Sequence, residues 1–259
     1  MAVLAVLAVI FRAFDMKISE LLYNKGNFFA GFCENIGAAL PFLICSFCFA
    51  TLIFCRHTRT TRNKNTLLSI LCGIASLICS FVTVFYPLRK SSVNYYWLIF
   101  AAAVLCAICI FLAATLFKST YQKILMTKYA KIGILSSLIS TAAYLVATLV
   151  PQRPSYAAIL LSIEKFGNPD SPEATVPFFA MSGVGAAIMI WIVCFAEIFP
   201  KLKFSSKYLL AFSIIWSLAM LIGSVIGGNT YGFEVICAII STNIIMFVVQ
   251  RFIKKDEKD

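Results

Sequence analysis

The sequence predicts an all-α, polytopic helical membrane protein with about eight spans, the first of them short. Seven runs of roughly 19 to 23 mostly apolar residues, and a shorter run at the start, divide the chain. About 20 helical residues cover the hydrocarbon core of a bilayer. The composition agrees, because 61% of the residues are hydrophobic and only 13% are charged. Backbone groups find no partners in lipid, so such runs cross as helices, and barrel strands would be shorter and alternating.

The runs predict individual spans within a single membrane domain, residues 1–259. Residues 1–117 hold the N-terminal spans, residues 118–252 hold the remaining ones, and residues 253–259 form a cytoplasmic basic tail. The expected spans are 1–14, 33–55, 66–87, 95–117, 132–150, 177–199, 207–227 and 233–252.

The charge pattern predicts the orientation. The formal net charge is +11, and the lysines and arginines concentrate in short connections between apolar runs. Placing both termini in the cytoplasm puts about 15 basic residues inside and about six outside, as multi-pass plasma-membrane proteins have them. Because these charges set topology and do not line a groove, the lipid bilayer is the expected partner and nucleic acid is not. A protein partner is left unidentified.

Two outer segments predict short helices. The first run is only about 14 residues long, and Asp15 after it can cap a helix in which Ile18, Leu21 and Leu22 share a face. A second helical pattern lies between residues 154 and 167. Two interpretations stay open: these helices rest on the bilayer surface, or they roof a site beneath them. The apolar positions of the second pattern are Tyr156, Ile159, Leu160, Ile163 and Phe166.

The ten cysteines all lie in or at the ends of apolar runs. Two pairs have two-residue gaps, but no histidine or further cysteine pair accompanies them at ligand spacing, so we expect packing and no metal site. A disulfide between Cys33 and Cys237 is left open. The two pairs are Cys45/Cys48 and Cys106/Cys109.

Three outward-facing stretches carry motif-like residues. They are Arg153-Pro154 after the fifth span, Met181-Ser182-Gly183-Val184 in the sixth, and Gly223 to Glu234 between the seventh and eighth. In order and sidedness they resemble the K-x6-R-P, P-S-G-H and S-R-x5-H-x3-D motifs of the type 2 phosphatidic acid phosphatase (lipid phosphatase) superfamily, and the chain is most similar to bacterial membrane members. The resemblance implies that the outer helix ends form one polar pocket, with a histidine nucleophile and with cations that hold the lipid phosphate.

The chain departs from these motifs at the reactive positions. Val146 stands for the lysine, Val184 for the histidine of P-S-G-H, Ser224 for the arginine and Thr230 for the nucleophilic histidine, with Glu234 for its aspartate. The one histidine in the chain, His57, is expected on the cytoplasmic side. An imidazole is what supplies nucleophile and acid in that mechanism, so we expect no catalytic residues.

What survives predicts an anion pocket without catalysis. A cation surrounded by hydroxyl and amide donors can hold an anion without cleaving it. The function expected is therefore a catalytically inactive lipid phosphatase-like pseudoenzyme, which binds a lipid or polyprenyl phosphate or scaffolds a partner at the extracytoplasmic face. No cofactor or metal is expected. The candidate pocket residues are Arg153, Ser182, Gly183, Ser224, Asn229, Thr230 and Glu234.

Three alternatives remain. The protein is an active phosphatase with altered chemistry, in which Glu234 activates Thr230. It is a transporter or channel subunit, although no charge lies at mid-span. Or the glycines serve packing alone, since Gly223-x3-Gly227 and Gly183-x3-Ala187 are small-x3-small pairs, and Ser182 and Ser224 bond their own helix backbones.

Overall fold

The computed structural model describes most of the chain. Outside the description lie residue 1, residue 25 and residues 56–61, 89–93, 150–152, 161–174, 177–179, 201–205 and 257–259, together with the side chains at 2–3, 62–65, 153, 175–176 and 254–256. His57 and the second half of the expected helix at 154–167 are among them. The side chain of Arg153 is too, although its backbone is described.

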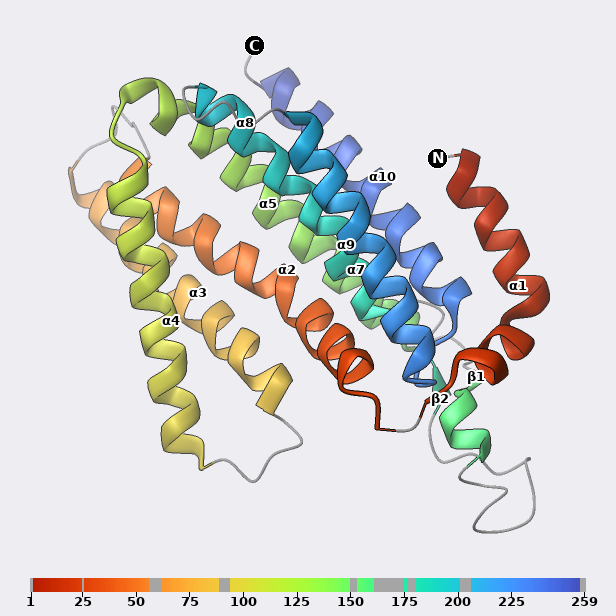
Figure 1. Ribbon diagram of the computed structural model, residues 1–259. Helices are drawn as coiled ribbons and strands as arrows, with labels where there is room; N and C mark the ends of the chain where they lie inside the picture. Colours follow the sequence, from red (N-terminus) through yellow and green to blue (C-terminus); the bar gives the residue numbers. More distant parts are fainter. Residues whose placement is uncertain are drawn as a thin grey trace. The chain divides into compact units, whose positions relative to one another are not determined.

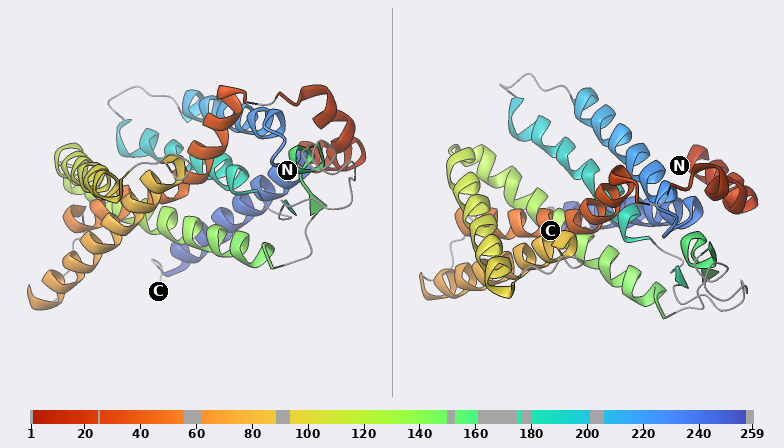
Figure 2. Two further views of the ribbon diagram at one scale, coloured as in Figure 1. Left: turned by 90° about the horizontal axis from the view of Figure 1, so that it is seen from below. Right: turned by 60° about the horizontal axis from the view of Figure 1, so that its bottom comes forward.

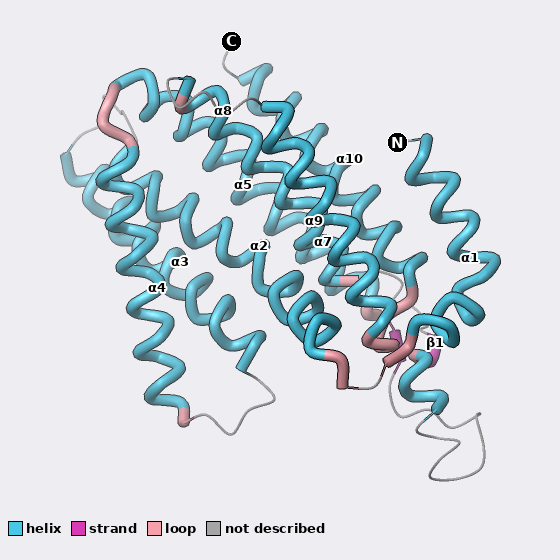
Figure 3. Tube along the Cα trace, viewed as in Figure 1, coloured by secondary structure: helices cyan, strands magenta, loops and turns pink. Residues whose placement is uncertain are grey.

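Helices make up nearly all of the described chain (Figures 1 and 3). Two strands of two residues each pair antiparallel, with Arg153 opposite Val176. Residues 156–160 form a further short helix. The elements are α1 (Ala2–Leu22), α2 (Phe28–Cys55), α3 (Arg62–Leu88), α4 (Tyr95–Leu116), α5 (Thr120–Ala147), β1 (Arg153–Pro154), β2 (Thr175–Val176), α7 (Met181–Ile188), η1 (Met189–Val193), α8 (Cys194–Ile198), α9 (Ser206–Ile226) and α10 (Gly232–Asp256).

Seven of the described helical segments are long and apolar enough to cross a membrane, which confirms the predicted all-α polytopic architecture. The segment Met181–Ile198 is one of them, although its middle, η1, is wound as a 3₁₀ helix. Several bounds differ from prediction: α2 begins at Phe28 and not at 33, and α3 begins at Arg62 and not at 66. α5 begins at Thr120 and not at 132, and α10 continues to Asp256, so the expected tail from 253 is helical at its start.

α1 corrects the prediction for the N-terminus. It is one uninterrupted helix of 21 residues, so Asp15 does not begin a helix of its own. No glycine or proline interrupts residues 2–22, and a helix therefore continues through the expected break. Asp15 instead accepts a hydrogen bond from the backbone N–H of Phe233, at 3.4 Å, in the first turn of α10. With its four charged residues, α1 is not among the seven apolar spans.

The chain forms two compact units. Unit 1 holds residues 1–38, 139–189 and 212–245, and unit 2 holds residues 39–138, 190–211 and 246–259. Every candidate pocket residue and all four degenerate motif positions belong to unit 1.

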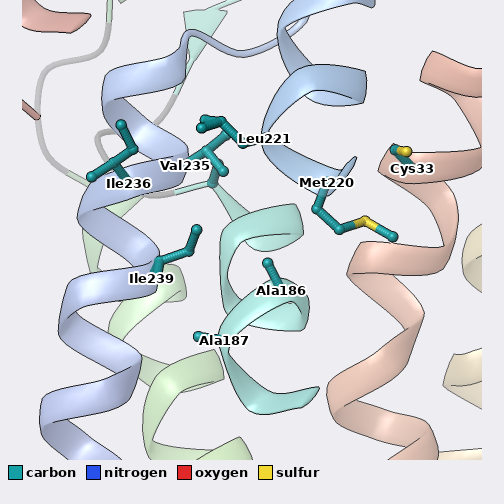
Figure 4. Close-up of a cluster of buried hydrophobic side chains, with 9 residues drawn as sticks. Cys33, Ala186, Ala187, Met220, Leu221, Val235, Ile236 and Ile239 are labelled. Carbon is teal, nitrogen blue, oxygen red and sulfur yellow. The ribbon is translucent and has the colours of Figure 1, made fainter. Parts of the chain in front are cut away.

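The core of unit 1 centres on α7. Ala186 and Ala187 lie between side chains of α10 and α9, and Cys33 of α2 completes the cluster (Figure 4). Two glycines let α7 approach its neighbours. A Cβ on Gly185 would overlap the backbone of Gly37, and one on Gly183 would lie 2.5 Å from the carbonyl oxygen of Val235. Close packing at Gly183 therefore agrees with the small-x3-small interpretation, which had not singled out Gly185.

Unit 2 packs through small polar side chains. α3 and α4 lie side by side (Figure 2). Between Thr66 and Leu88, the buried positions of α3 carry only cysteine, serine and threonine. Ser46 of α2 hydrogen bonds the hydroxyls of Ser76, at 3.1 Å, and Ser80, at 2.7 Å. Such hydroxyl contacts hold helices together where lipid provides no hydrophobic drive between them.

The cysteines serve packing. All ten are free thiols and nine are buried, Cys237 being the half-buried one. The disulfide left open between Cys33 and Cys237 is not formed. Among the residues that the structure describes, no group of histidine, cysteine, aspartate and glutamate side chains is arranged to hold a metal ion.

Candidate functional site

The second and third motif stretches meet through a hydroxyl pair. The hydroxyl of Ser224, at the end of α9, donates to the hydroxyl of Ser182, in the first turn of α7, at 2.9 Å. Both side chains are buried. The expectation that each serine bonds its own helix backbone missed this contact, which joins residues 42 positions apart. A second link is the backbone N–H of Ala180, which donates to the carbonyl of Glu234 at 3.4 Å.

The first motif stretch lies against the third. Pro154 in β1 offers its carbonyl oxygen to the hydroxyl of Tyr231, at 2.9 Å, and the same phenol lies 3.3 Å from the sulfur of Met16. Tyr231 is among the largest fully buried side chains of the described chain. The backbone of Arg153, one residue before Pro154, is thereby placed beside the α9–α10 turn. All three stretches thus converge within unit 1.

The α9–α10 turn carries the remaining polar candidates. The side-chain amide of Asn229 donates to both carboxylate oxygens of Glu34, each at 2.9 Å. The hydroxyl of Thr230 donates to the backbone carbonyl of Ser224 at 3.4 Å. Gly228 has φ +66°, a conformation that glycine adopts without strain. Glu34 is not among the residues predicted for the pocket, and its contact with Asn229 was not predicted.

The degenerate positions do not share one environment. Val184 is fully buried, with 0% of its surface exposed, whereas the side chain of Val146 is 63% exposed. Position 146, where the related motif has its lysine, therefore does not face inward in this chain. Glu234 is buried in the first turn of α10. Its carboxylate lies where the helix dipole favours negative charge.

Two segments, one after α1 and one after β1, contact the α9–α10 turn. The backbone N–H of Asn24 donates to Ile226 O, and that of Ala157 donates to Gly228 O, both at 3.1 Å. Tyr23 and Tyr156 contact each other edge to face, with ring centroids 5.4 Å apart. Burial, and then the nearby Glu20 carboxylate, raise the pKa of Tyr156. Of the two interpretations left open, these contacts agree with a roof.

The described side chains contain no activated nucleophile in this region. Thr230 directs its hydroxyl proton at a backbone carbonyl, and Ser224 directs its own at Ser182. General-base activation needs a basic group within hydrogen-bond reach of that proton. In the described residues, both hydroxyl protons are therefore directed at protein oxygens.

The charge balance of unit 1 is slightly acidic. It carries five of the 22 lysines and arginines and seven of the eleven aspartates and glutamates. Arg12 is exposed on α1, with its guanidinium carbon 5.4 Å from the ring centre of Phe233. An anion at this turn would therefore depend on local donors, because the overall field of unit 1 does not attract it.

Comparison of the chain with protein-family models, with curated proteins and with solved structures finds no match.

Proposed function

We propose that this chain is a non-catalytic membrane protein of the lipid phosphatase type, which binds the phosphorylated headgroup of a lipid or polyprenyl phosphate without hydrolysing it. The observation that supports this most is the convergence of three stretches distant in the sequence. Ser224 contacts Ser182, and Tyr231 contacts Pro154, within one compact unit. A plasma-membrane location with the pocket outside the cell follows from the charge pattern of the connections and belongs to the same proposal.

The loss of catalysis follows from residue chemistry. The three reactive positions within the converging stretches carry valine, serine and threonine. Valine neither donates nor accepts a proton, and the hydroxyls of Ser224 and Thr230 already donate to Ser182 and to a backbone carbonyl. A phosphoryl group held there would find no imidazole to act as nucleophile or as acid.

Binding rests mainly on Arg153. It is the one cation of the motif stretches, and a guanidinium makes two parallel hydrogen bonds to phosphate. Ser182 and Asn229 would add neutral donors. Because Glu34 contacts Asn229 and Glu234 lies buried in the first turn of α10, we expect binding to be weak without the arginine and sensitive to salt.

The test uses lipid pairs that differ only in the phosphate. Purified full-length protein in nanodiscs is titrated with phosphatidic acid against diacylglycerol, and with a polyprenyl phosphate against its polyprenol. We expect preference for the phosphorylated member and a loss of about tenfold or more in Arg153→Ala, since hydrogen bonds to charged groups contribute about 1.5–3 kcal/mol. Lys17→Ala, an exposed cation of the same unit, is the matched control and keeps the preference.

One observation favours the scaffold version of this proposal. The described polar groups of the site already satisfy one another, as Asn229 does with Glu34 and Ser224 with Ser182. A polar network closed in this way fixes helix positions without any ligand. If both members of each lipid pair bind equally and Arg153→Ala has no effect, only the scaffold version of the proposal remains.

A further inference from the structure

Unit 2 carries a concentration of positive charge that the proposed function does not use. It holds 17 of the 22 lysines and arginines but only four of the eleven acids. Glu197 is the one acid of unit 2 whose side chain is described, and it accepts a hydrogen bond from the hydroxyl of Tyr129. The described basic side chains of unit 2 are Lys118, Lys123, Lys128, Lys131, Lys207 and Arg251.

Contacts within unit 2 place several helix ends together. The hydroxyl of Thr127, in α5, donates to the carbonyl of Cys55, the last residue of α2, at 2.9 Å. Phe117, just after α4, contacts Phe199, just after α8, with ring centroids 5.7 Å apart. Tyr129 joins α5 to the end of α8. The end of α4, the start of α5 and the ends of α2 and α8 therefore form one end of the unit, as Figure 1 shows.

Three lysines with accessible side chains belong to the elements that form or follow this end. Lys118 follows Phe117, Lys131 lies three turns into α5, and Lys207 is the second residue of α9. All three are exposed. Two tyrosines stand close to them in sequence, Tyr121, 60% exposed, and Tyr208, 74% exposed. We call Lys118, Lys131 and Lys207 the basic rim.

We propose that the basic rim binds the phosphate-bearing headgroups of anionic phospholipids in the leaflet that surrounds this end of unit 2. Lys118 lies in the connection between the spans α4 and α5, Lys131 precedes the apolar part of α5, and Lys207 lies at the start of the span α9. Headgroups are therefore the first anions in reach of the rim. Long lysine side chains extend from such positions to the headgroup level, and tyrosines concentrate there. A lysine near an anionic lipid surface contributes a factor of about five in association.

A nucleic acid or an acidic protein segment would also carry the required charge. Lipid is favoured because the exposed neighbours of the rim are apolar as well as aromatic. Ile124 in α5 is 57% exposed and Leu210 in α9 is 42% exposed, which suits contact with acyl chains. This surface lies wholly in unit 2, and the inference does not depend on the proposed function of unit 1.

The test measures lipid preference around the full-length protein. Spin-labelled phosphatidylglycerol and phosphatidylcholine with identical chains are compared in nanodiscs, and the protein-contacting fraction of each is read by electron paramagnetic resonance. We expect wild-type protein to prefer the anionic lipid, and the triple variant Lys118→Gln/Lys131→Gln/Lys207→Gln to lose at least fivefold of that preference, with a weaker preference at high salt.

Two controls separate charge from structure. The triple Lys→Arg variant at the same positions keeps the charge and retains the preference. Arg12→Gln/Lys17→Gln, which removes two exposed charges of unit 1, also retains it. No anionic preference in the wild type, an undiminished preference in the Gln variant, or an equal loss in the Arg variant would overturn the proposal. So would displacement of the anionic lipid by oligonucleotide or by acidic peptide at lower concentration than by soluble glycerophosphate.

Discussion

Ser224 donates its hydroxyl proton to the hydroxyl of Ser182 across 2.9 Å, although the two serines are 42 residues apart. Both side chains are buried between α7 and α9. The contact joins two of the three motif stretches directly, and the carbonyl of the same Ser224 accepts the hydrogen bond of Thr230. Ser224 is therefore the residue around which the polar part of unit 1 is organised.

We expect the two serines to be coupled energetically. Ser224→Ala and Ser182→Ala each leave one buried hydroxyl without this partner, which costs about 1–3 kcal/mol. The double variant should lose less than the sum, with a coupling of about 0.6 kcal/mol and at most about 1.7 kcal/mol, the range found between membrane helices. Unfolding in mixed micelles measures all four proteins. Additive losses would show that the two hydroxyls do not interact.

Gly185 should tolerate no side chain. Gly185→Ala directs a methyl group at the backbone of Gly37, and a backbone cannot move aside as a flexible side chain can. We expect a loss of about 1–3 kcal/mol or more. Gly31→Ala, on the same helix as Gly37, meets nothing within 4 Å and should be neutral or slightly stabilising. Thermal inactivation followed by size-exclusion chromatography compares the pair, and equal stabilities would contradict the close approach of α2 and α7.

Asp15 should stabilise the start of α10 from a distance in sequence. Its buried carboxylate accepts from the backbone N–H of Phe233, as an N-cap residue does, and it faces the positive end of the helix dipole. We expect Asp15→Ala to cost about 1 kcal/mol and to speed amide exchange in the first turn of α10. Glu20→Ala, an exposed acid of α1, is the control. Unchanged amide exchange in Asp15→Ala would show that Asp15 does not cap α10.

Restoring the motif residue should lower stability at Val184 and leave it nearly unchanged at Val146. Val184→His places a polar ring where no surface is exposed, and we expect a loss of about 1–3 kcal/mol. Val146→Lys introduces its charge at a position that is 63% exposed, and stability should change by less than about 0.5 kcal/mol. Chemical unfolding of both variants and of the wild type measures these changes in the free energy of unfolding. A stable Val184→His protein would indicate more room around α7 than its burial implies.

The features of this fold that could be predicted depend on residues close together in the sequence, and those that could not be predicted depend on residues far apart. Apolar runs depend on neighbouring residues, and the spans from α2 to α10 agree with prediction to within a few residues at most of their ends. α5 is the exception, because the mixed segment 120–131 continues a helix beyond the apolar run. The cap at Phe233 is different, since a carboxylate 218 positions away provides it. The sequence around Asp15 predicted that it caps a helix of its own. Only the tertiary structure shows that it caps α10 instead.

The candidate site shows the same division. Motif order indicated which stretches to compare, and their residues do contact one another. The partners of individual side chains were not accessible to such reasoning. Glu34 carries no sequence signal that points to Asn229, and a pair of serines on separate helices can each bond locally or to each other. Small residues at 37 and 185 were a signal for close helix approach that had been overlooked.

Binding and turnover measured in one sample test the central claim most directly. Full-length protein in nanodiscs is incubated with radiolabelled phosphatidic acid or polyprenyl phosphate, and both retained lipid and released phosphate are counted, alongside Arg153→Ala and Thr230→Val. We predict retention that Arg153→Ala lowers about tenfold or more, with no release of phosphate in any sample. Release that disappears in Thr230→Val would contradict the account, because it would make the α9–α10 turn a catalytic centre.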